Sequence, residues 1–349
     1  MKIFINTPKL TLRGGVANNY NGLKPYFSEN VIYNEIGKRT ENSGLGVLWL
    51  PYDIVKFFIR LKIAKPDVVL LNPSLNKSAL ARDFIFLRIS KLLHCKTAVY
   101  IHGFDWNYAK KSNHSWVVRN LNRADLIFVL ANQFKEELIR WKVKTPIILQ
   151  TSKVDDRLVN NFDINSRTGT IRKLLFLSRI EKGKGIYESI NTYSLLKKKY
   201  PELCLKIVGS GSELAEVKKY IKKKDIKGVE VAGQVSVNDL INHFKESDAY
   251  IFPTFYGEGL PTSVLEAMAF GLPVFTRYVG GLCDFFENEK MGFITNSLDP
   301  QDFANAISMF IQDAVRTRDV CIYNFNYAKE HFMASKVART LENDLKTII

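Results

Sequence analysis

The sequence lacks the features that mark several protein classes. Its four cysteines, Cys95, Cys204, Cys283 and Cys321, are scattered singly, and no two have metal-ligand spacing. This pattern excludes a cysteine-built metal site and favours reduced, buried thiols in a cytoplasmic protein. No apolar run approaches the roughly 18 residues of a membrane span. No signal peptide precedes the apolar run Met1–Ile5. We therefore expect a protein that stays inside the cell.

Low-complexity segments and repeats are also missing. We find no biased run and no internal period of 20–50 residues, which excludes disordered and solenoid architectures. Hydrophobic residues make up 46% of the chain and charged residues 24%, the balance of a folded globular protein. A length of 349 residues suits two domains of roughly 150–180 residues each.

The positive charge is placed unevenly along the chain. The formal net charge is +15, and residues 1–165 hold 25 Lys and Arg against 13 Asp and Glu. The remaining residues hold 25 against 22. A basic half attracts anionic membrane surface, anionic small substrates or nucleic acid, and the charge alone leaves the three open.

Short apolar runs alternate with helical stretches along the whole chain. Strands are predicted for Lys2–Asn6, Val31–Glu35, Asp67–Asn72, Thr97–His102, Leu126–Leu130, Ile147–Gln150, Lys173–Ser178, Leu203–Val208, Val229–Ala232, Ala249–Pro253, Leu272–Thr276 and Gly292–Thr295. Strands that alternate with helices form parallel sheets with right-handed crossovers, and twelve strands do not fit one sheet comfortably. The fold class is therefore α/β, with two Rossmann-like doubly wound domains that face each other across a cleft.

The boundary between these domains is expected in the polar, breaker-rich stretch 151–170. We assign residues 1–163 to the first domain and residues 164–330 to the second. Residues 331–349 are expected to form a helix that packs back on the first domain, by analogy with that fold.

The most informative segment is Ala249–Gly271, which reads AYIFPTFYGEGLPTSVLEAMAFG. A strand ends at Pro253, and a helix is predicted to start near Pro261, whose missing N–H suits the first helical position. Glu258 then lies in the loop and Glu266 lies one and a half turns into the helix. Loop amides and a helix N-terminus form a donor-rich mouth that favours anions or polyol oxygens.

This segment resembles the Glu-x7-Glu signature of glycosyltransferase family 4, a large family of retaining GT-B enzymes. The resemblance implies that Glu258 binds hydroxyls of the donor sugar and that Glu266 binds the ribose of the nucleotide. It also implies that the amides of Gly259 and Leu260 approach the sugar and phosphate. By the same resemblance, residues 1–163 form an acceptor-binding domain and residues 164–330 a nucleotide-sugar-binding domain. Without the resemblance, two acids at a helix start would serve only to stabilise the helix dipole.

A second segment, Leu174–Gly185, reads LLFLSRIEKGKG and places cations where a strand ends. Arg179 and Lys184 are candidates for neutralising a diphosphate as it becomes a leaving group. They match the family's Arg, spacer and Lys-Gly pattern, whereas Ser178 stands where the family usually has Gly. Lys182 competes with Lys184 for the role, and an exposed basic turn is the alternative.

Two glycine pairs follow predicted strands. Gly209 and Gly211 lie in the turn after Leu203–Val208, where glycines allow a ligand to approach the backbone. Gly14 and Gly15 follow the first strand and resemble the family's N-terminal Gly-Gly loop beside the donor diphosphate and the acceptor. Ordinary tight turns are the alternative for both pairs.

His102 ends the predicted strand Thr97–His102 and is followed by Gly103. A solitary His is more often structural than catalytic, but the carboxyl end of a central strand is where open parallel sheets bind ligands. The family often carries His-Gly there, near the acceptor and donor sugar, so His102 is a candidate catalytic residue. Asp105 is a candidate on the acceptor side.

These motifs together predict a hexosyltransferase of cell-surface polysaccharide or glycolipid biosynthesis, such as capsule or lipopolysaccharide. The donor would be a UDP-, GDP- or ADP-sugar and the acceptor a saccharide or a lipid-linked saccharide. Family resemblance implies retention of anomeric configuration, without an obligatory metal ion or other cofactor. The alternatives are a GT-B epimerase or phosphorylase, and a nucleotide-binding scaffold without turnover. A nucleic-acid binder would leave Glu258 and Glu266 unexplained, and we expect no nucleic acid as a partner.

Two basic amphipathic segments raise the question of membrane contact. Trp49–Ala64 mixes bulky apolar residues with Lys56, Arg60 and Lys62, and Ala79–Leu93 is similar. Such helices can lie on an anionic bilayer, where lipid-linked acceptors are found. The alternative is a pair of ordinary core-facing helices with solvated cations. We keep peripheral association with the inner face of the cell membrane as a hypothesis.

Overall fold

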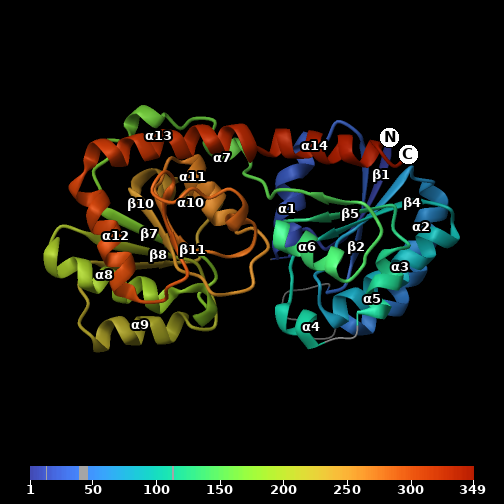
Figure 1. The fold of residues 1–349 in the computed structure, drawn as a ribbon, viewed down its shortest axis with the longest axis horizontal. Helices are drawn as coiled ribbons and strands as arrows, with labels where there is room; N and C mark the ends of the chain where they lie inside the picture. The colour runs from blue at the N-terminus through green and yellow to red at the C-terminus, as the bar shows by residue number, and fades with distance from the viewer. Residues whose placement is uncertain (13, 39–45, 112–113) are drawn as a thin grey trace. The chain divides into compact units, whose positions relative to one another are not determined.

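The computed structural model describes residues 1–12, 14–38, 46–111 and 114–349. The chain forms two compact units (Figure 1). The first unit contains Met1–Lys153, Gly257–Leu260 and Ala334–Ile349, and the second contains Val154–Tyr256 and Pro261–Met333. Along the chain, the first unit ends at Lys153, ten residues before the expected boundary at residue 163. Val154 already belongs to the second unit, where its amide donates to the carbonyl oxygen of Phe332 at 2.7 Å.

The first unit is built on a parallel sheet of six strands in the order β2-β1-β3-β4-β5-β6. Its strands are β1 (Lys2–Pro8), β2 (Asn30–Ile36), β3 (Val68–Leu71), β4 (Lys96–Ile101), β5 (Leu126–Val129) and β6 (Ile147–Leu149). Its α-helices are α1 (Gly15–Leu23), α2 (Leu50–Ala64), α3 (Lys77–Leu92), α4 (Trp106–Lys111), α5 (Ser115–Leu121), α6 (Asn132–Arg140) and α14 (Ala334–Lys346), with 3₁₀ turns η1 (Lys24–Tyr26) and η2 (Gly46–Trp49).

The second unit has its own parallel sheet, in the order β12-β11-β10-β7-β8-β9. Its strands are β7 (Lys173–Leu177), β8 (Cys204–Val208), β9 (Val229–Gly233), β10 (Ala249–Phe252), β11 (Val274–Arg277) and β12 (Gly292–Thr295). Its α-helices are α7 (Asp156–Val159), α8 (Ile186–Lys199), α9 (Leu214–Lys223), α10 (Val237–Glu246), α11 (Thr262–Ala269), α12 (Pro300–Gln312) and α13 (Ala314–His331). Three 3₁₀ turns, η3 (Ile164–Ser166), η4 (Lys182–Lys184) and η5 (Gly280–Asp284), complete it.

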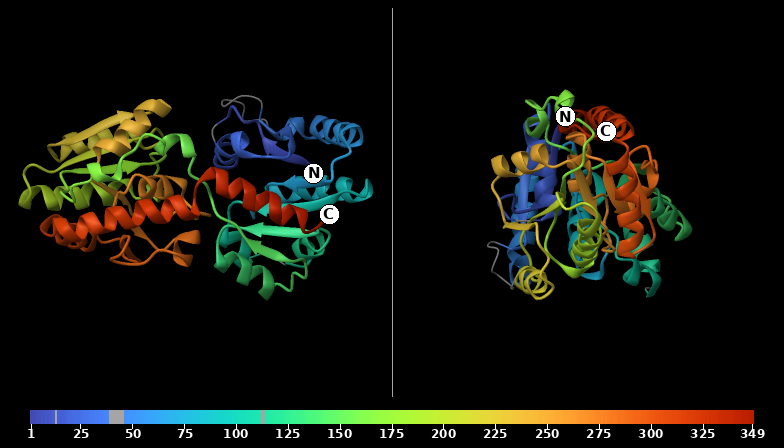
Figure 2. Two further views of the ribbon diagram at one scale, coloured as in Figure 1. Left: turned by 90° about the horizontal axis from the view of Figure 1, so that it is seen from above. Right: turned by 90° about the vertical axis from the view of Figure 1, so that its left-hand side faces the viewer.

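Both sheets are buried between helices, as Figures 1 and 2 show within each unit. Every residue of β3, β5 and β10 is buried, which is how strands covered on both faces are expected to pack. All twelve predicted strands are present, and every strand pair is parallel. The predicted α/β class with two doubly wound sheets is confirmed.

Helix α14 belongs to the first unit, although it is the last element of the chain. The buried carboxylate of Glu342 accepts hydrogen bonds from the amide and the hydroxyl of Ser28, at 2.8 and 2.7 Å. The two chain termini lie side by side (Figure 2), because Glu29 pairs with the N-terminal amine and with Lys346, each at 2.8 Å. The hydrogen bonds that the Glu29 carboxylate accepts from these two cations lower its pKa to about 2.

Three local expectations are corrected by the structure. The cysteines are free thiols, but only Cys321 is buried, and Cys283 is exposed because the turn η5 turns it outward. Burial raises the pKa of the Cys321 thiol to about 11. Pro261 is the N-cap of α11 rather than its first residue. His102 follows β4, which ends one residue earlier at Ile101.

The described part of the chain holds no helix with both the length and the hydropathy that a membrane crossing requires.

Candidate functional site

Three turns of the second unit meet where the neighbouring strands β10, β7 and β8 end. The amide of Ile180, after β7, donates to the carbonyl oxygen of Ser210, after β8, at 3.0 Å. The amide of Phe255, after β10, donates to the carbonyl oxygen of Gly183 at 2.9 Å. Because carboxyl ends of parallel strands share one edge of the sheet, segments far apart in the sequence form one surface here.

The predicted glycines of this surface are required by close backbone packing. A Cβ on Gly209, whose φ is +134°, would stand 1.8 Å from the carbonyl oxygen of Ser178. A Cβ on Gly211 would stand 2.3 Å from the carbonyl oxygen of Ile180. Gly185, with φ +78°, is the left-handed residue from which α8 starts, and its Cβ would stand 2.4 Å from the carbonyl oxygen of Pro253. These glycines let the turns approach one another.

The two predicted cations of this unit gather around one aromatic ring. The ammonium of Lys184 lies 4.2 Å from the centroid of Tyr256, and the guanidinium of Arg179 lies 5.7 Å from the same centroid. Lys184 is 6% exposed, whereas Lys182 is exposed to solvent, so burial distinguishes the two competing lysines. Arg179 also pairs with Glu181 at 2.9 Å. The sequence reasoning missed Tyr256, although an aromatic residue beside the Gly-Glu-Gly loop was visible.

The loop Gly257–Leu260 groups with the first unit. It places the partly exposed Glu258 there, and a Cβ on Gly259 would stand 2.3 Å from the carbonyl oxygen of His102. The loop therefore lies against the residue that follows β4. Leu260 is buried, and Glu266 is 8% exposed on α11 of the second unit.

His102 is held by three side chains of the first unit. Its ring stacks on Tyr100 with centroids 4.0 Å apart and meets Tyr20 edge-on at 6.2 Å. Its Nε2 atom lies 2.9 Å from Oδ1 of Asn72, which also accepts a 2.6 Å hydrogen bond from the hydroxyl of Tyr20. Burial disfavours the charged imidazolium and lowers the pKa of His102 to about 3.

The orientation of the Asn72 amide fixes which nitrogen of His102 carries the proton. The NH₂ group of Asn72 donates to the carbonyl oxygens of Asn6 and Leu70, at 2.9 and 3.4 Å. Its oxygen therefore faces the imidazole as an acceptor, and Nε2 must be the donor. Neutral His102 then keeps Nδ1 as a hydrogen-bond acceptor. Such a ring can accept a hydrogen bond from a sugar hydroxyl and cannot contribute positive charge near neutral pH.

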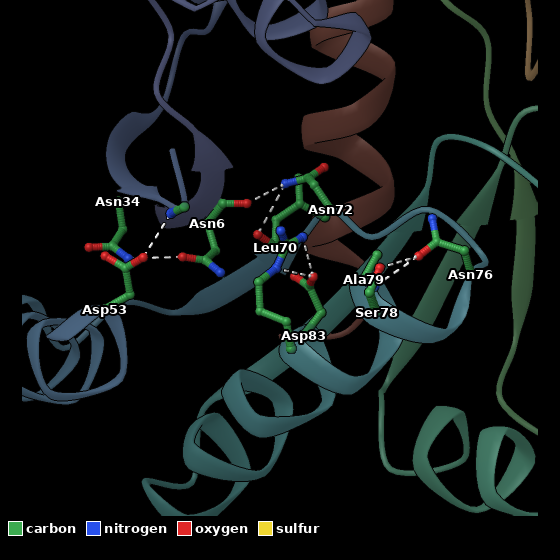
Figure 3. A network of polar contacts seen from close by, with 11 residues as sticks. Asn6, Asn34, Asp53, Leu70, Asn72, Asn76, Ser78, Ala79 and Asp83 are labelled. Carbon is green, nitrogen blue, oxygen red and sulfur yellow. Dashed lines mark hydrogen bonds and ion pairs between the residues drawn. The ribbon is translucent and has the colours of Figure 1, made fainter. Parts of the chain in front are cut away.

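This histidine belongs to a row of polar residues at the carboxyl ends of adjacent strands, part of which Figure 3 shows. Asn34 of β2 donates to Oδ1 of Asn6 of β1 at 2.8 Å, and Asn6 accepts from Asn72 after β3. Asn6, Asn34 and Asn72 are buried, and Nδ2 of Asn6 has no hydrogen-bond partner among the described residues. The sequence reasoning missed this row. The signal was an asparagine at or near the end of three consecutive apolar runs.

The remaining predicted residues of the first unit lie in open turns. A Cβ on Gly14 or Gly15, at the start of α1, would meet no atom within 4 Å, and the neighbouring Arg13 lies outside the described residues. The exposed carboxylate of Asp105 accepts from the amides of Asn107 and Tyr108, at 3.0 and 3.1 Å. Asp105 thus acts as an N-terminal cap of α4.

No group of three or more His, Cys, Asp or Glu side chains in the described segments is arranged to hold a metal ion. The candidate site residues offer hydrogen-bonding groups and positive charge. Lys184 and Arg179 attract anions, while the asparagine row and neutral His102 suit hydroxyl groups.

Comparison with known proteins gives this site a family context. Residues 160–327 match the family model "Glycosyl transferases group 1". An uncharacterized glycosyltransferase of Haemophilus influenzae is 29% identical over 186 residues, which cover 53% of this chain and 51% of that protein. A putative teichuronic acid biosynthesis glycosyltransferase, TuaC of Bacillus subtilis, is 23% identical over 258 residues, which cover 71% of this chain and 63% of that protein. The chain thus spans about half to two thirds of these relatives.

The fold has matches over its whole length. The crystal structure of HepE from Anabaena, solved with UDP and glucose, aligns with a TM-score of 0.75 at 17% identity and covers 99% of this chain and 100% of that chain. At this identity the likeness shows the fold alone. Residues 160–327 thus resemble the glycosyl transferases group 1 model, and the chain as a whole has the GT-B fold.

Proposed function

We propose that the protein is a retaining glycosyltransferase that moves a hexose from a nucleoside diphosphate sugar to a saccharide or lipid-linked saccharide. The observation that carries the proposal is the pair of cations, Lys184 and Arg179, gathered on Tyr256 where β7 and β10 end. In a parallel sheet this edge is the usual ligand site, and the pair suits a diphosphate.

The proposed mechanism uses these cations on the leaving group. Breaking the bond between the anomeric carbon and the diphosphate places negative charge on phosphate and oxocarbenium character on the sugar. Lys184 and Arg179 stabilise the departing diphosphate, so that no metal ion is obligatory. Glu258 binds donor-sugar hydroxyls, Glu266 binds ribose, and the amides of Gly259 and Leu260 approach the sugar and phosphate.

The first unit supplies the groups that suit hydroxyls. His102, a neutral acceptor at Nδ1, takes a hydrogen bond from a sugar hydroxyl, and the Gly14-Gly15 turn approaches the diphosphate and the acceptor. Some relatives are named for wall or capsule polymers, among them TuaC for teichuronic acid and CapM of Staphylococcus aureus for capsular polysaccharide. These names support a role in cell-surface polysaccharide or glycolipid synthesis.

Donor binding is the first test. A ligand at 100 times its dissociation constant stabilises a protein by about 2.7 kcal/mol, so UDP-, GDP- and ADP-sugars should be compared by thermal shift. We expect one nucleotide class to raise Tm, and Lys184→Ala to abolish the shift while the exposed Lys182→Ala keeps it. No shift with any donor would contradict the proposal.

Product analysis tests the reaction itself. With the active donor and an oligosaccharide acceptor, proton NMR should show a new glycosidic linkage with the anomeric configuration of the donor. Transfer should persist in EDTA. A product with inverted anomeric configuration would refute retention, and loss of transfer on chelation would refute metal independence. An altered donor sugar without transfer would identify an epimerase.

A further inference from the structure

Helix α2 presents apolar side chains to solvent on the face opposite its core contacts. Tyr52, Val55, Ile59 and Ile63 are 56%, 57%, 49% and 77% exposed. Their spacing of three or four residues places them in one row along the helix. Trp49, the N-cap of α2, is also exposed and lies edge-on to Tyr52 with centroids 6.0 Å apart.

The opposite face of α2 packs against the core of the first unit. Phe57 and Leu61 are buried there, and Phe57 lies 5.6 Å from Phe4 of β1 and 4.7 Å from Phe86 of α3, between ring centroids. A surface helix normally has charged or polar residues away from the core. In α2 the outer row is apolar although the inner face already packs against the sheet, so packing within the unit does not explain it.

The surface charge on the helices around this row has one sign, although the exposed Asp67, which follows α2, accepts from the amide of Lys2 at 2.6 Å. Helices α2, α3 and α5 lie next to one another in the first unit (Figure 1). Their only two carboxylates, Asp53 and Asp83, are both buried. Asp53 accepts from the amide of Gly37 at 2.7 Å, and Asp83 pairs with Arg82 at 2.6 Å.

Cations reach the surface on the same helices. Lys62, Lys77, Arg88 and Arg119 are exposed, and the partly exposed cations of the three helices are Lys56, Arg60, Arg82 and Lys91. Lys62 is exposed beside the row, and Lys65 follows at the C-cap of α2. An apolar row flanked by exposed cations, with no exposed carboxylate on these helices, matches an anionic bilayer surface. A protein partner would gain from acids as well as bases at the rim of such a surface.

We propose that this face, formed by Trp49, Tyr52, Val55, Ile59 and Ile63 with Lys62 and Lys65 beside them, is a docking surface for anionic lipid bilayers. The apolar row enters the interfacial region, and the lysines remain at the level of the headgroups. The inference goes beyond the proposed sugar transfer and does not depend on it. It gives the peripheral membrane hypothesis a defined surface.

Vesicle flotation of the full chain tests the proposal. The protein should float with vesicles of equal phosphatidylglycerol and phosphatidylcholine and remain unbound with phosphatidylcholine alone. Raising salt from about 0.1 to about 1 M shortens the Debye length from roughly 10 to 3 Å and should weaken binding. No binding to the anionic vesicles would overturn the proposal.

Paired variants connect the binding to this face. Ile59→Gln with Ile63→Gln should lower the partition coefficient on the order of ten-fold or more, because aliphatic carbons no longer enter the bilayer. The matched control, Met309→Gln with Val315→Gln, changes two exposed apolar residues of the second unit and should bind like wild type. Equal loss in both pairs would contradict the assignment.

A second pair of double variants tests the contribution of charge to bilayer binding. Lys62→Glu with Lys65→Glu should weaken binding, whereas Lys222→Glu with Lys223→Glu, exposed on α9, should not. All variants should keep the wild-type Tm and donor-induced thermal shift, so a failure of bilayer binding is distinguishable from a failure of the proposed enzyme activity. The wild-type protein could instead form dimers and fail to bind vesicles. If the double variant Ile59→Gln with Ile63→Gln then dissociated these dimers, the proposal would be overturned, and the face would be an interface with a second copy of the chain.

Discussion

His102 and Asn72 face each other across 2.9 Å, with the amide oxygen accepting and Nε2 of the imidazole donating. The contact joins two adjacent strands, since His102 follows β4 and Asn72 follows β3. The ring is consequently neutral and held in one tautomer. Replacing the neutral acceptor by a charged one of the same shape tests this relationship.

Asn72→Asp should raise the pKa of His102. A carboxylate within hydrogen-bond distance favours the imidazolium, commonly by about 1–3 pKa units. The change is measured by following the Cε1 proton of His102 through an NMR titration, with His102→Gln to assign the resonance. In wild type, nitrogen shifts of the ring should report the Nε2-protonated tautomer. An Nδ1-protonated ring would contradict the orientation derived for Asn72.

The pH dependence of stability should contain a contribution from His102. Its pKa is lowered to about 3 in the folded protein, against about 6.5 for an unperturbed histidine. Between these values the unfolded chain binds the proton more readily, so this contribution is lost as pH falls from about 6.5 toward 3. His102→Gln should reduce the decline in urea midpoint between about pH 7 and 5. Identical pH profiles for both proteins would show that His102 does not contribute.

Lys184→Ala should lower kcat much more than Lys182→Ala. Only Lys184 is buried against Tyr256, and removing one preorganised donor to a developing charge typically lowers kcat by about 10²–10³. Steady-state kinetics with the donor found by thermal shift would measure both. Equal kcat losses would indicate that the turn acts only through its overall charge.

Gly209→Ala should destabilise the second unit more than Gly233→Ala. Both glycines have positive φ, +134° and +71°, but only at Gly209 would a Cβ meet backbone, 1.8 Å from an oxygen. We expect Gly233→Ala to lower the free energy of unfolding by about 1 kcal/mol, because alanine is strained in the left-handed conformation, and Gly209→Ala to lower it by more. Urea unfolding of both variants provides the comparison. A smaller loss at Gly209 would contradict the packing of the turn after β8 against the turn after β7.

The resemblance to sugar-transferring enzymes was carried by short contiguous strings such as Gly257–Gly271 and Arg179–Gly185. Such strings are legible because a strand end, a loop and a helix start follow one another in the chain. They identified Arg179 and Lys184 as candidates but left Lys182 and Lys184 in competition. Burial on Tyr256 distinguishes the two lysines, and burial is a property of packing.

The sequence by itself determined the alternation of strands and helices, because short apolar runs that alternate with helical stretches favour parallel sheets covered on both faces. Tertiary structure decided which distant residues meet. The row from Asn34 through Asn6 and Asn72 to His102 comes from four strands whose order in the sheet differs from their order in the chain. It also decided that the outer row of α2 faces solvent, since amphipathic spacing cannot tell which of two apolar faces will be covered.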